Sequence, residues 1–136
     1  MNYLQWYKRA LLLGMILNGC AIIGIFFFPH ALLRILSIPE PPLIWVRAVG
    51  MLVTNVSISY IPALLNPAEN RWVAIYTVVP RLVSALFFFT EVWVFDWDSG
   101  FLNLGLFDFL FGAIQSVLLY GAFGRGRAGE RARAMT

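Results

Sequence analysis

An arginine lies in the middle of a long apolar run, and this feature constrains the fold most. The segment from Trp72 to Val94 is predominantly apolar, and Arg81 follows Pro80 close to its centre. An α-helix of about 20 residues spans the roughly 30 Å hydrocarbon core of a bilayer. A charged side chain at that depth costs at least ~2.5–3.5 kcal/mol. The rest of the chain must therefore supply polar partners for Arg81 inside the membrane.

The composition agrees with a membrane protein. The chain has 136 residues, of which 60% are hydrophobic and 12% charged, against roughly a quarter charged in soluble domains. Its net charge of +3 is accounted for by arginines after Gly124, a position typical of a cytoplasmic anchor and not of a nucleic-acid surface. With one cysteine and one histidine, the chain holds no internal disulfide and no Cys/His metal cluster.

Four apolar segments are predicted to cross the membrane, and turn or proline residues separate them. The predicted helices cover about residues 10–28, 43–65, 72–91 and 101–123. The sequence thus predicts one domain of the all-α integral membrane class, a four-transmembrane-helix antiparallel bundle. Residues 30–38 are predicted to form a short helix at the membrane surface. Residues 124–136 are rich in Gly, Arg and Ala and are predicted to be a basic disordered cytoplasmic tail.

The distribution of Lys and Arg predicts the orientation. Both termini carry most of these residues, so the positive-inside rule places both in the cytoplasm. We therefore predict a multi-pass protein of the cell inner membrane, with Trp6 and Tyr7 at the headgroup level. Arg34 and Arg47 fall on the outer side and run against the rule.

The loop at residues 92–100 alternates aromatic and acidic side chains. Trp93, Phe95 and Trp97 are interleaved with Asp96 and Asp98. We interpret it as an interfacial aromatic belt whose acidic residues cap the fourth helix. The alternative is a cation or headgroup site outside the membrane.

Each predicted span carries a polar side chain at a similar depth. At about 1.5 Å per residue, Arg81 lies roughly 13 Å from the cytoplasmic edge of the membrane core. On the same scale Asn18 and Asn55 lie near ~12 Å and Gln115 near ~9 Å. These four side chains are expected to form one polar layer.

Asp108 is the predicted ion-pair partner of Arg81. It lies roughly 10 Å below the opposite membrane surface, a few ångströms from Arg81 and within reach of its long side chain. Arg47 is expected on the other side of Asp108 or paired with Glu91. One inward face of the fourth helix is predicted to carry Gly105, Asp108, Gly112 and Gln115, at spacings of three and four.

The buried polar groups have two interpretations. In the first, the Arg81–Asp108 pair fixes the order of the helices. In the second, the polar layer lines a pocket for a lipid headgroup, a quinone or another polar-headed ligand. Pro80 leaves a backbone carbonyl without its helical hydrogen bond one turn earlier, which a ligand or a side chain could use. No cofactor is required by the sequence, although a quinone would fit the second interpretation.

Catalysis by this chain alone is not expected. The sequence has no nucleophile–base pair, glycine-rich phosphate loop or pair of carboxylates at catalytic spacing. The leading hypothesis is an accessory or scaffold subunit that self-associates or joins other membrane proteins, with membrane lipids and not nucleic acid around it. The alternative is a binder or carrier of a small lipophilic ligand. The candidate ligand-binding residues are Arg81, Asp108, Asn18, Asn55, Gln115 and Arg47.

Several features resemble the DoxX-like group of small bacterial membrane proteins. The first predicted helix closes on Phe27-Phe28-Pro29, a Leu-Leu-Arg-Ile-Leu segment follows at residues 32–36, and the second opens with Arg47-x-x-Gly50. The resemblance covers about the first half of the chain. It implies an up-down four-helix bundle of the inner membrane, in some members a subunit of a quinone-linked oxidoreductase. It implies no functional residues here, because Arg81 and the Asp-rich loop match nothing in the group.

Overall fold

A computed structural model describes residues 2–133, with side chains described up to Gly124. In that part of the chain every regular element is a helix. In chain order the helices are α1 (Tyr3–Phe27), α2 (Pro29–Ile35), α3 (Leu43–Ser59), α4 (Ile61–Leu65), α5 (Arg71–Tyr76), α6 (Val79–Val94) and α7 (Phe101–Arg133).

Four helical spans are long and apolar enough to cross a membrane, as the sequence predicts. They cover Tyr3–Phe27, Leu43–Leu65, Arg71–Val94 and Phe101–Gly124. Only 17–28% of the residues in their apolar windows are buried inside the protein. Most apolar side chains therefore face outward, where lipid covers them. The chain is a multi-pass membrane protein with a helical-bundle fold.

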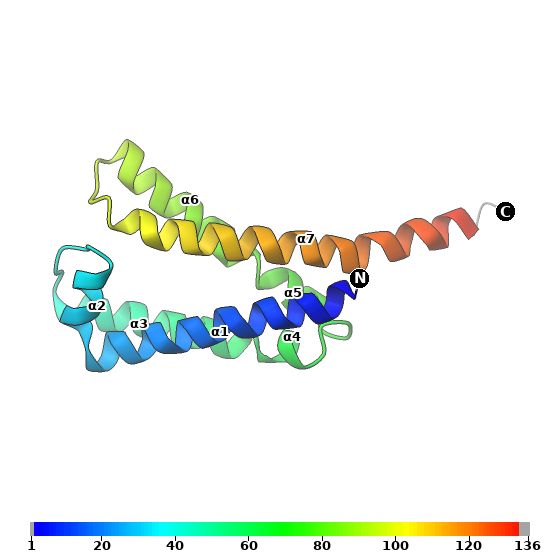
Figure 1. Ribbon diagram of the computed structural model, residues 1–136, viewed down its shortest axis with the longest axis horizontal. Helices are drawn as coiled ribbons and strands as arrows, with labels where there is room; N and C mark the ends of the chain where they lie inside the picture. The colour runs from blue at the N-terminus through cyan, green and yellow to red at the C-terminus, as the bar shows by residue number, and fades with distance from the viewer. Residues whose placement is uncertain (1, 134–136) are drawn as a thin grey trace.

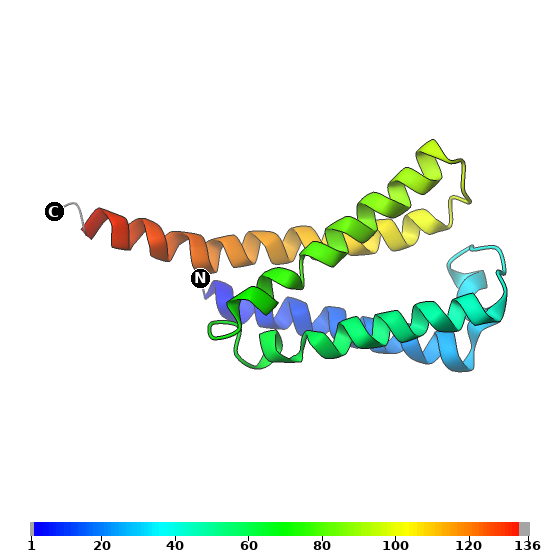
Figure 2. The ribbon, with the colours of Figure 1, turned by 180° about the vertical axis from the view of Figure 1, so that it is seen from behind.

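The spans run antiparallel in an open order. Figure 1 shows α1 and α3 on one side, α6 and α7 on the other, and both chain ends at one end of the bundle. We call this the terminus end and the opposite end the hairpin end. Extensive contacts join α6 to α7, α7 to α1 and α1 to α3, whereas α3 and α6 share almost none. The view from behind shows α3 and α6 diverging toward the hairpin end (Figure 2).

Two of the spans are broken, where the sequence predicts continuous helices. The second breaks at Tyr60, two residues before Pro62, and the third at Thr77–Val78, just before Pro80. Proline has no N–H to donate to the carbonyl four residues earlier, and its ring clashes with that carbonyl. The breaks lie at similar levels and bring α4 and α5 together beside α1.

Two hydrophobic clusters form the core. The cluster at the terminus end comprises Tyr7, Leu11, Tyr60, Ala63, Ala74, Val78 and Leu119. The cluster at the hairpin end comprises Ile25, Leu33, Ile38 and Val46, with Phe101 and Leu104 packed against it. The first joins all four spans, whereas the second holds α2 and α3 on α1 and the start of α7 but includes no residue of α6.

A turn after α2 joins the segment between α2 and α3 to the start of α7 at the hairpin end. Ser37 adopts the left-handed conformation with φ 57°, and Ile38 N–H donates to the Leu33 carbonyl, as in a Schellman C-cap. Asn103 Nδ2 of α7 then donates to the Leu36 carbonyl at 3.1 Å. A Cβ on Gly100 would collide with the Ser37 backbone, so a glycine is required where α7 begins.

Several predicted boundaries differ from the structure. The first span begins at Tyr3 and the third ends at Val94, because flanking aromatic and polar residues continue these helices. The fourth span is predicted to end near Phe123, whereas α7 runs on to Arg133. The disordered, cytoplasmic character of residues 124–136 stays a prediction. Residues 134–136 of the predicted tail lie outside the described residues.

Candidate intramembrane polar site

Arg81 lies in the first turn of α6, directly after the proline that breaks the third span. Only 3% of the residue is exposed. A Cβ on Gly14 of α1 would stand 3.0 Å from Arg81 Nη2, and one on Gly112 of α7 would stand 2.8 Å from Leu82. Gly14 thus leaves room on α1 for the guanidinium, and Gly112 lets α7 approach α6 closely.

The predicted ion pair is present. Arg81 Nη1 lies 2.9 Å from Asp108 Oδ1, and 4% and 21% of the two side chains are exposed. The side chain of Ser84, one turn along α6, also lies beside the carboxylate. The rings of Phe107 and Phe111 lie 5.6 and 5.3 Å from the guanidinium carbon, within the range of cation–π attraction. One carboxylate and two aromatic faces therefore stabilise the buried cation.

The guanidinium is only partly satisfied by these contacts. Arg81 Nε and Nη2 are buried and have no hydrogen-bond partner within the described residues. A guanidinium carries five N–H donors and no acceptor, and each buried donor without a partner costs about 1–3 kcal/mol. The arrangement leaves buried donors without a protein partner, and only an acceptor can complete them.

A second polar cluster lies toward the terminus end. Tyr7 and Thr77 hydroxyls are 2.9 Å apart, and the Thr77 hydroxyl also donates to the Ala74 carbonyl at 2.8 Å. Gln115 joins through its Oε1, 3.4 Å from Thr77 Oγ1, while its Nε2 is buried without a partner among the described residues. The break at Thr77 places its side chain between α1 and α7.

Tyr7 is the residue that sequence reasoning missed. The prediction placed it at the headgroup level with Trp6, but its exposed fraction is 0%. Leu11 and Gly14 are also buried on α1, and spacings of four and three put them on the same face as Tyr7. That periodicity is the sequence signal that could have identified Tyr7 as a core residue.

The remaining predicted site residues divide into one that faces inward and two that do not. Asn18 Nδ2 donates to Ser57 Oγ of α3 at 3.1 Å, so it has a polar partner, although not the predicted layer. Asn55 and Arg47 are exposed on α3. Neither has a hydrogen bond or ion pair within the described residues. The predicted place of Arg47, on the other side of Asp108 or paired with Glu91, is therefore wrong, as is the place of Asn55 in the polar layer.

The reason for both errors is geometric. Counting residues at a fixed rise gives the depth of a side chain but not its direction around the helix axis. Ser57 of α3 faces α1, and Asn55 lies two residues earlier, about 200° around the helix. Only one of the two residues can therefore face the bundle interior.

The acidic loop behaves as a turn. Asp98 Oδ1 accepts a hydrogen bond from Gly100 N–H at 2.8 Å, one residue before α7 begins. Trp97 packs at 5.5 Å between ring centroids against Phe101 of α7. These contacts agree with the interpretation of the loop as an aromatic belt that caps the fourth helix.

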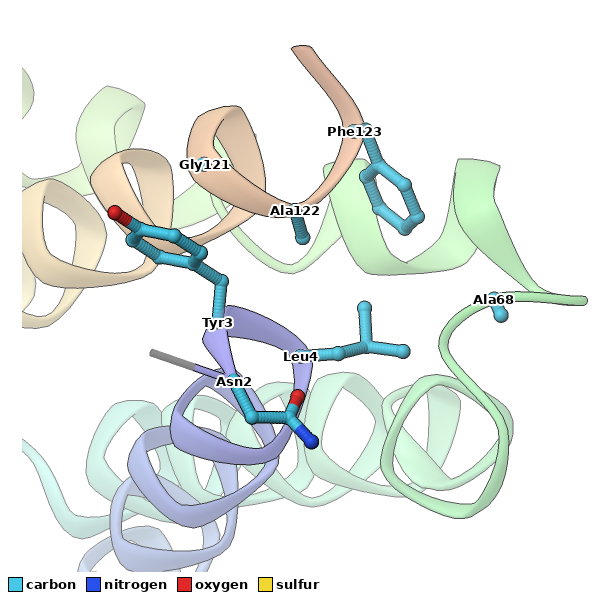
Figure 3. A pocket seen from close by; sticks show the side chains of 7 residues that line it. All are labelled: Asn2, Tyr3, Leu4, Ala68, Gly121, Ala122 and Phe123. Carbon is cyan, nitrogen blue, oxygen red and sulfur yellow. The ribbon is translucent and has the colours of Figure 1, made fainter. Parts of the chain in front are cut away.

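A surface pocket lies at the terminus end and is separate from these groups. Figure 3 shows Tyr3, Leu4 and Phe123 around it. Its volume is about 370 Å³, and it is lined by Asn2, Tyr3, Leu4, Ala68, Gly121, Ala122 and Phe123. Arg71 of α5 lies over the ring of Phe123, with its guanidinium carbon 4.8 Å from the ring centroid. None of the predicted ligand-binding residues lines this pocket.

No known protein family, curated protein or solved structure matches the chain. The likeness to DoxX-like proteins therefore rests on the sequence features alone, and the function must be argued from the geometry.

Proposed function

We propose that the chain binds a lipophilic molecule through a hydrogen-bond-accepting oxygen on its head, which Arg81 holds inside the membrane. The observation that carries the proposal is the pair of buried donors on Arg81, Nε and Nη2, without partners in the described part of the chain. A structural ion pair needs no such free donors, because a second carboxylate oxygen or an amide could have filled them. A ligand oxygen fills them only when it is bound.

The charge of the site favours a neutral head. Asp108 already balances the guanidinium at 2.9 Å, so an anionic ligand would leave an uncompensated charge in a medium of low dielectric constant. A carbonyl oxygen, as in a quinone ring or a lipid ester, accepts hydrogen bonds without that cost. Gln115 Nε2, also buried without a partner among the described residues, offers a further donor to a two-carbonyl head.

The packing of the spans indicates where the apolar part of such a ligand would lie. The α3–α6 pair has almost no contact, whereas α6–α7 and α1–α7 are closely packed. A tail along α3 and α6 would therefore displace little protein contact. We place this site in a cell inner membrane with both termini cytoplasmic, as the charge distribution predicts.

Native mass spectrometry of protein extracted gently from its own membrane tests the proposal. The wild type should carry a small-molecule adduct, and the double variant Arg81→Met/Asp108→Leu should lose it. The double variant removes the free donors and the carboxylate together, so it leaves no buried unpaired charge. A matched control is Asn18→Leu/Ser57→Ala, which removes a polar pair elsewhere in the bundle and should keep the adduct.

Two results would contradict the proposal: a wild type without any adduct, or an adduct that the double variant retains. The chemistry of the adduct is read after solvent extraction. A quinone shows an ultraviolet band that borohydride reduction removes, whereas a lipid ester shows fragment masses of its acyl chains and no such band.

The second candidate function is that of an accessory subunit in a membrane complex. It is favoured by the hairpin-end half of α6 and the loop after it, where Trp93 and Phe95 are 71% and 62% exposed and α3 shares almost no contact with α6. Large aromatic side chains supply contact area at protein interfaces. The same spectra distinguish this candidate, because a complex would appear as added polypeptide masses that Trp93→Ala reduces and Arg81→Met/Asp108→Leu does not.

A further inference from the structure

The pocket at the terminus end lies where the membrane-spanning parts of the chain end. It is lined by residues 2–4 of α1, by Ala68 of the turn after α4 and by residues 121–123 of α7 (Figure 3). The first span begins at Tyr3 and the fourth ends at Gly124, so the pocket is level with the boundary between hydrocarbon and headgroups. Its volume of about 370 Å³ is within the range of small-ligand sites. Lipid headgroups are therefore the molecules that a membrane places beside it.

A cation without a carboxylate partner lies beside the wall of this pocket. Arg71, the first residue of α5, is partly buried, and its guanidinium carbon is 4.8 Å from the ring centroid of Phe123. Within the described residues the guanidinium has no hydrogen bond and no ion pair, although Glu69 lies two residues earlier in the chain. A guanidinium carries five N–H donors. Arg71 thus keeps its donors available to an oxygen anion.

The charges near the pocket are mostly positive. Lys8 lies one turn after Leu4 on the same side of α1, and its ammonium donates to the Leu65 carbonyl at 3.0 Å. Arg9 follows it in the chain. Against these two cations and the arginine of α5, the described part of the terminus end carries one carboxylate, that of Glu69, which forms no ion pair there. The excess of positive charge attracts anions to this end.

We propose that the pocket binds the head of an anionic phospholipid, with a phosphate oxygen on Arg71 and the glycerol region against Leu4 and Phe123. Arginine matches the geometry of a phosphate through paired N–H donors, and basic pockets between membrane helices bind anionic headgroups. A soluble anion would leave the apolar lining uncovered. A second copy on a two-fold axis would bring its own cations against these. The site is separate from the one around Arg81 and does not depend on it.

Lipid titration of the full chain in detergent tests the proposal. Native mass spectrometry compares phosphatidylglycerol with phosphatidylcholine that has the same acyl chains. The wild type should bind phosphatidylglycerol more tightly than phosphatidylcholine. Arg71→Gln should lower the affinity for phosphatidylglycerol about fivefold, which is the effect of one basic residue near a charged lipid surface.

Two matched controls remove one positive charge elsewhere. Arg34→Gln does so at an exposed position of α2 at the hairpin end, and Arg133→Gln does so near the C-terminus. Both variants should bind phosphatidylglycerol as the wild type does, because neither residue lines or adjoins the pocket.

A second variant fills the pocket and leaves the charge unchanged. Ala68 is exposed in the turn between α4 and α5, so Ala68→Trp should fold normally while its ring occupies the space of the lipid head. Its affinity for phosphatidylglycerol should fall severalfold. Arg81→Met/Asp108→Leu should keep that affinity, which distinguishes this site from the one proposed around Arg81. Melting curves by circular dichroism show which variants are folded.

Four outcomes would overturn the proposal. The first is equal binding of the two lipids by the wild type. The second is wild-type affinity for phosphatidylglycerol in Arg71→Gln or in Ala68→Trp when that variant is folded. The third is an equal loss in Arg34→Gln or Arg133→Gln, which would show that only the net charge matters. The fourth is displacement of the lipid by millimolar inorganic phosphate, which would assign the pocket to a soluble anion.

Discussion

The two ends of the bundle are held together in different ways. At the terminus end all four spans gather around Tyr7, where the helix breaks turn α4 and α5 inward and hydroxyl and amide groups join α1, α5 and α7. At the hairpin end α6 stacks its phenylalanines on α7, with Phe88 and Phe101 centroids 6.0 Å apart, while α3 packs chiefly on α1 and shares almost no contact with α6. Buried polar contacts join the spans at the terminus end, whereas at the hairpin end α3 and α6 stay apart and the connecting segments are joined by the Asn103–Leu36 hydrogen bond.

This contrast shows what prolines can do in a membrane bundle. Pro62 and Pro80 break two spans at similar levels. The short helices α4 and α5, on the terminus side of the breaks, can therefore close around α1 while the long helices α3 and α6 diverge. Arg81 lies at the boundary, one residue after the second proline. The free donors of Arg81 therefore occur where the bundle changes from closed to open.

The largest effect is expected at that boundary. Asp108→Leu removes the carboxylate that balances Arg81 and leaves a buried cation that cannot lose its proton. The free energy of unfolding should fall by about 3–5 kcal/mol. Reversible unfolding in mixed micelles, followed by circular dichroism, measures the change.

The compensated variant is the control for this prediction. Arg81→Met/Asp108→Leu should restore the wild-type stability or exceed it by about 1–4 kcal/mol, because apolar side chains often replace a buried pair without loss. If Asp108→Leu alone costs less than about 1 kcal/mol, the ion pair does not stabilise the packing of α6 on α7 as we describe.

A comparison of two glycines separates the ends more sharply. A Cβ at Gly100 would meet the Ser37 backbone, whereas one at Gly121 would meet the ring of Tyr3 at 2.5 Å. A backbone neighbour cannot move as a ring near the chain end can, so Gly100→Ala should cost about 1–3 kcal/mol and Gly121→Ala clearly less. The difference between the midpoint unfolding temperatures of the two variants measures this contrast. Equal losses of stability would contradict the close backbone contact between Gly100 and Ser37 at the hairpin end.

A smaller effect is expected inside the terminus-end cluster. Tyr7→Phe removes the hydroxyl that bonds to Thr77 and to the Ala74 carbonyl but keeps the ring. Thr77 retains its own bond to Ala74, so the loss should be about 1 kcal/mol. Denaturant titration of the purified variant checks this, with Tyr76→Phe, at an exposed position of α5, as the matched control that should show no change.

The smallest effect is expected for the contact between α1 and α3. Asn18→Leu removes the 3.1 Å hydrogen bond to Ser57, and membrane hydrogen bonds contribute about 0.6 kcal/mol on average. A double-mutant cycle with Ser57→Ala isolates that term. A coupling energy above about 2 kcal/mol would show that the Asn18–Ser57 pair, and not the Tyr7 cluster, makes the largest polar contribution to the packing of the spans.

The sequence predicts well how deep a side chain lies in the membrane, but poorly which way it points around the axis of its helix. The four spans and the Arg81–Asp108 pair follow from apolar length and from the need of one buried charge for another. The sequence predicts the wrong surroundings for Asn55 and Arg47, because their depth does not show which face of α3 is turned to the other spans. The directions depend on the breaks at Tyr60 and Thr77 and on which spans become neighbours, and both are tertiary properties.

The small residues were more informative than the charges. Gly105, Gly112 and Gln115 are buried, and the inward face predicted from their spacing is the face that α7 turns to its neighbours. The same reasoning applied to Tyr7, Leu11 and Gly14 would have found the face of α1. Periodicity of small and polar residues therefore identifies inward faces in this chain, where hydrophobicity alone cannot because lipid and core are equally apolar.

The central contact between α1 and α7 has a consequence for biosynthesis. It joins the first of the four described spans to the fourth, so the contacts at the centre of this bundle cannot form before the fourth span has been synthesised. During that interval the third span would carry the guanidinium of Arg81 into lipid with no carboxylate beside it. The translocation machinery should therefore retain the third span until the fourth emerges and release the two as a helical pair.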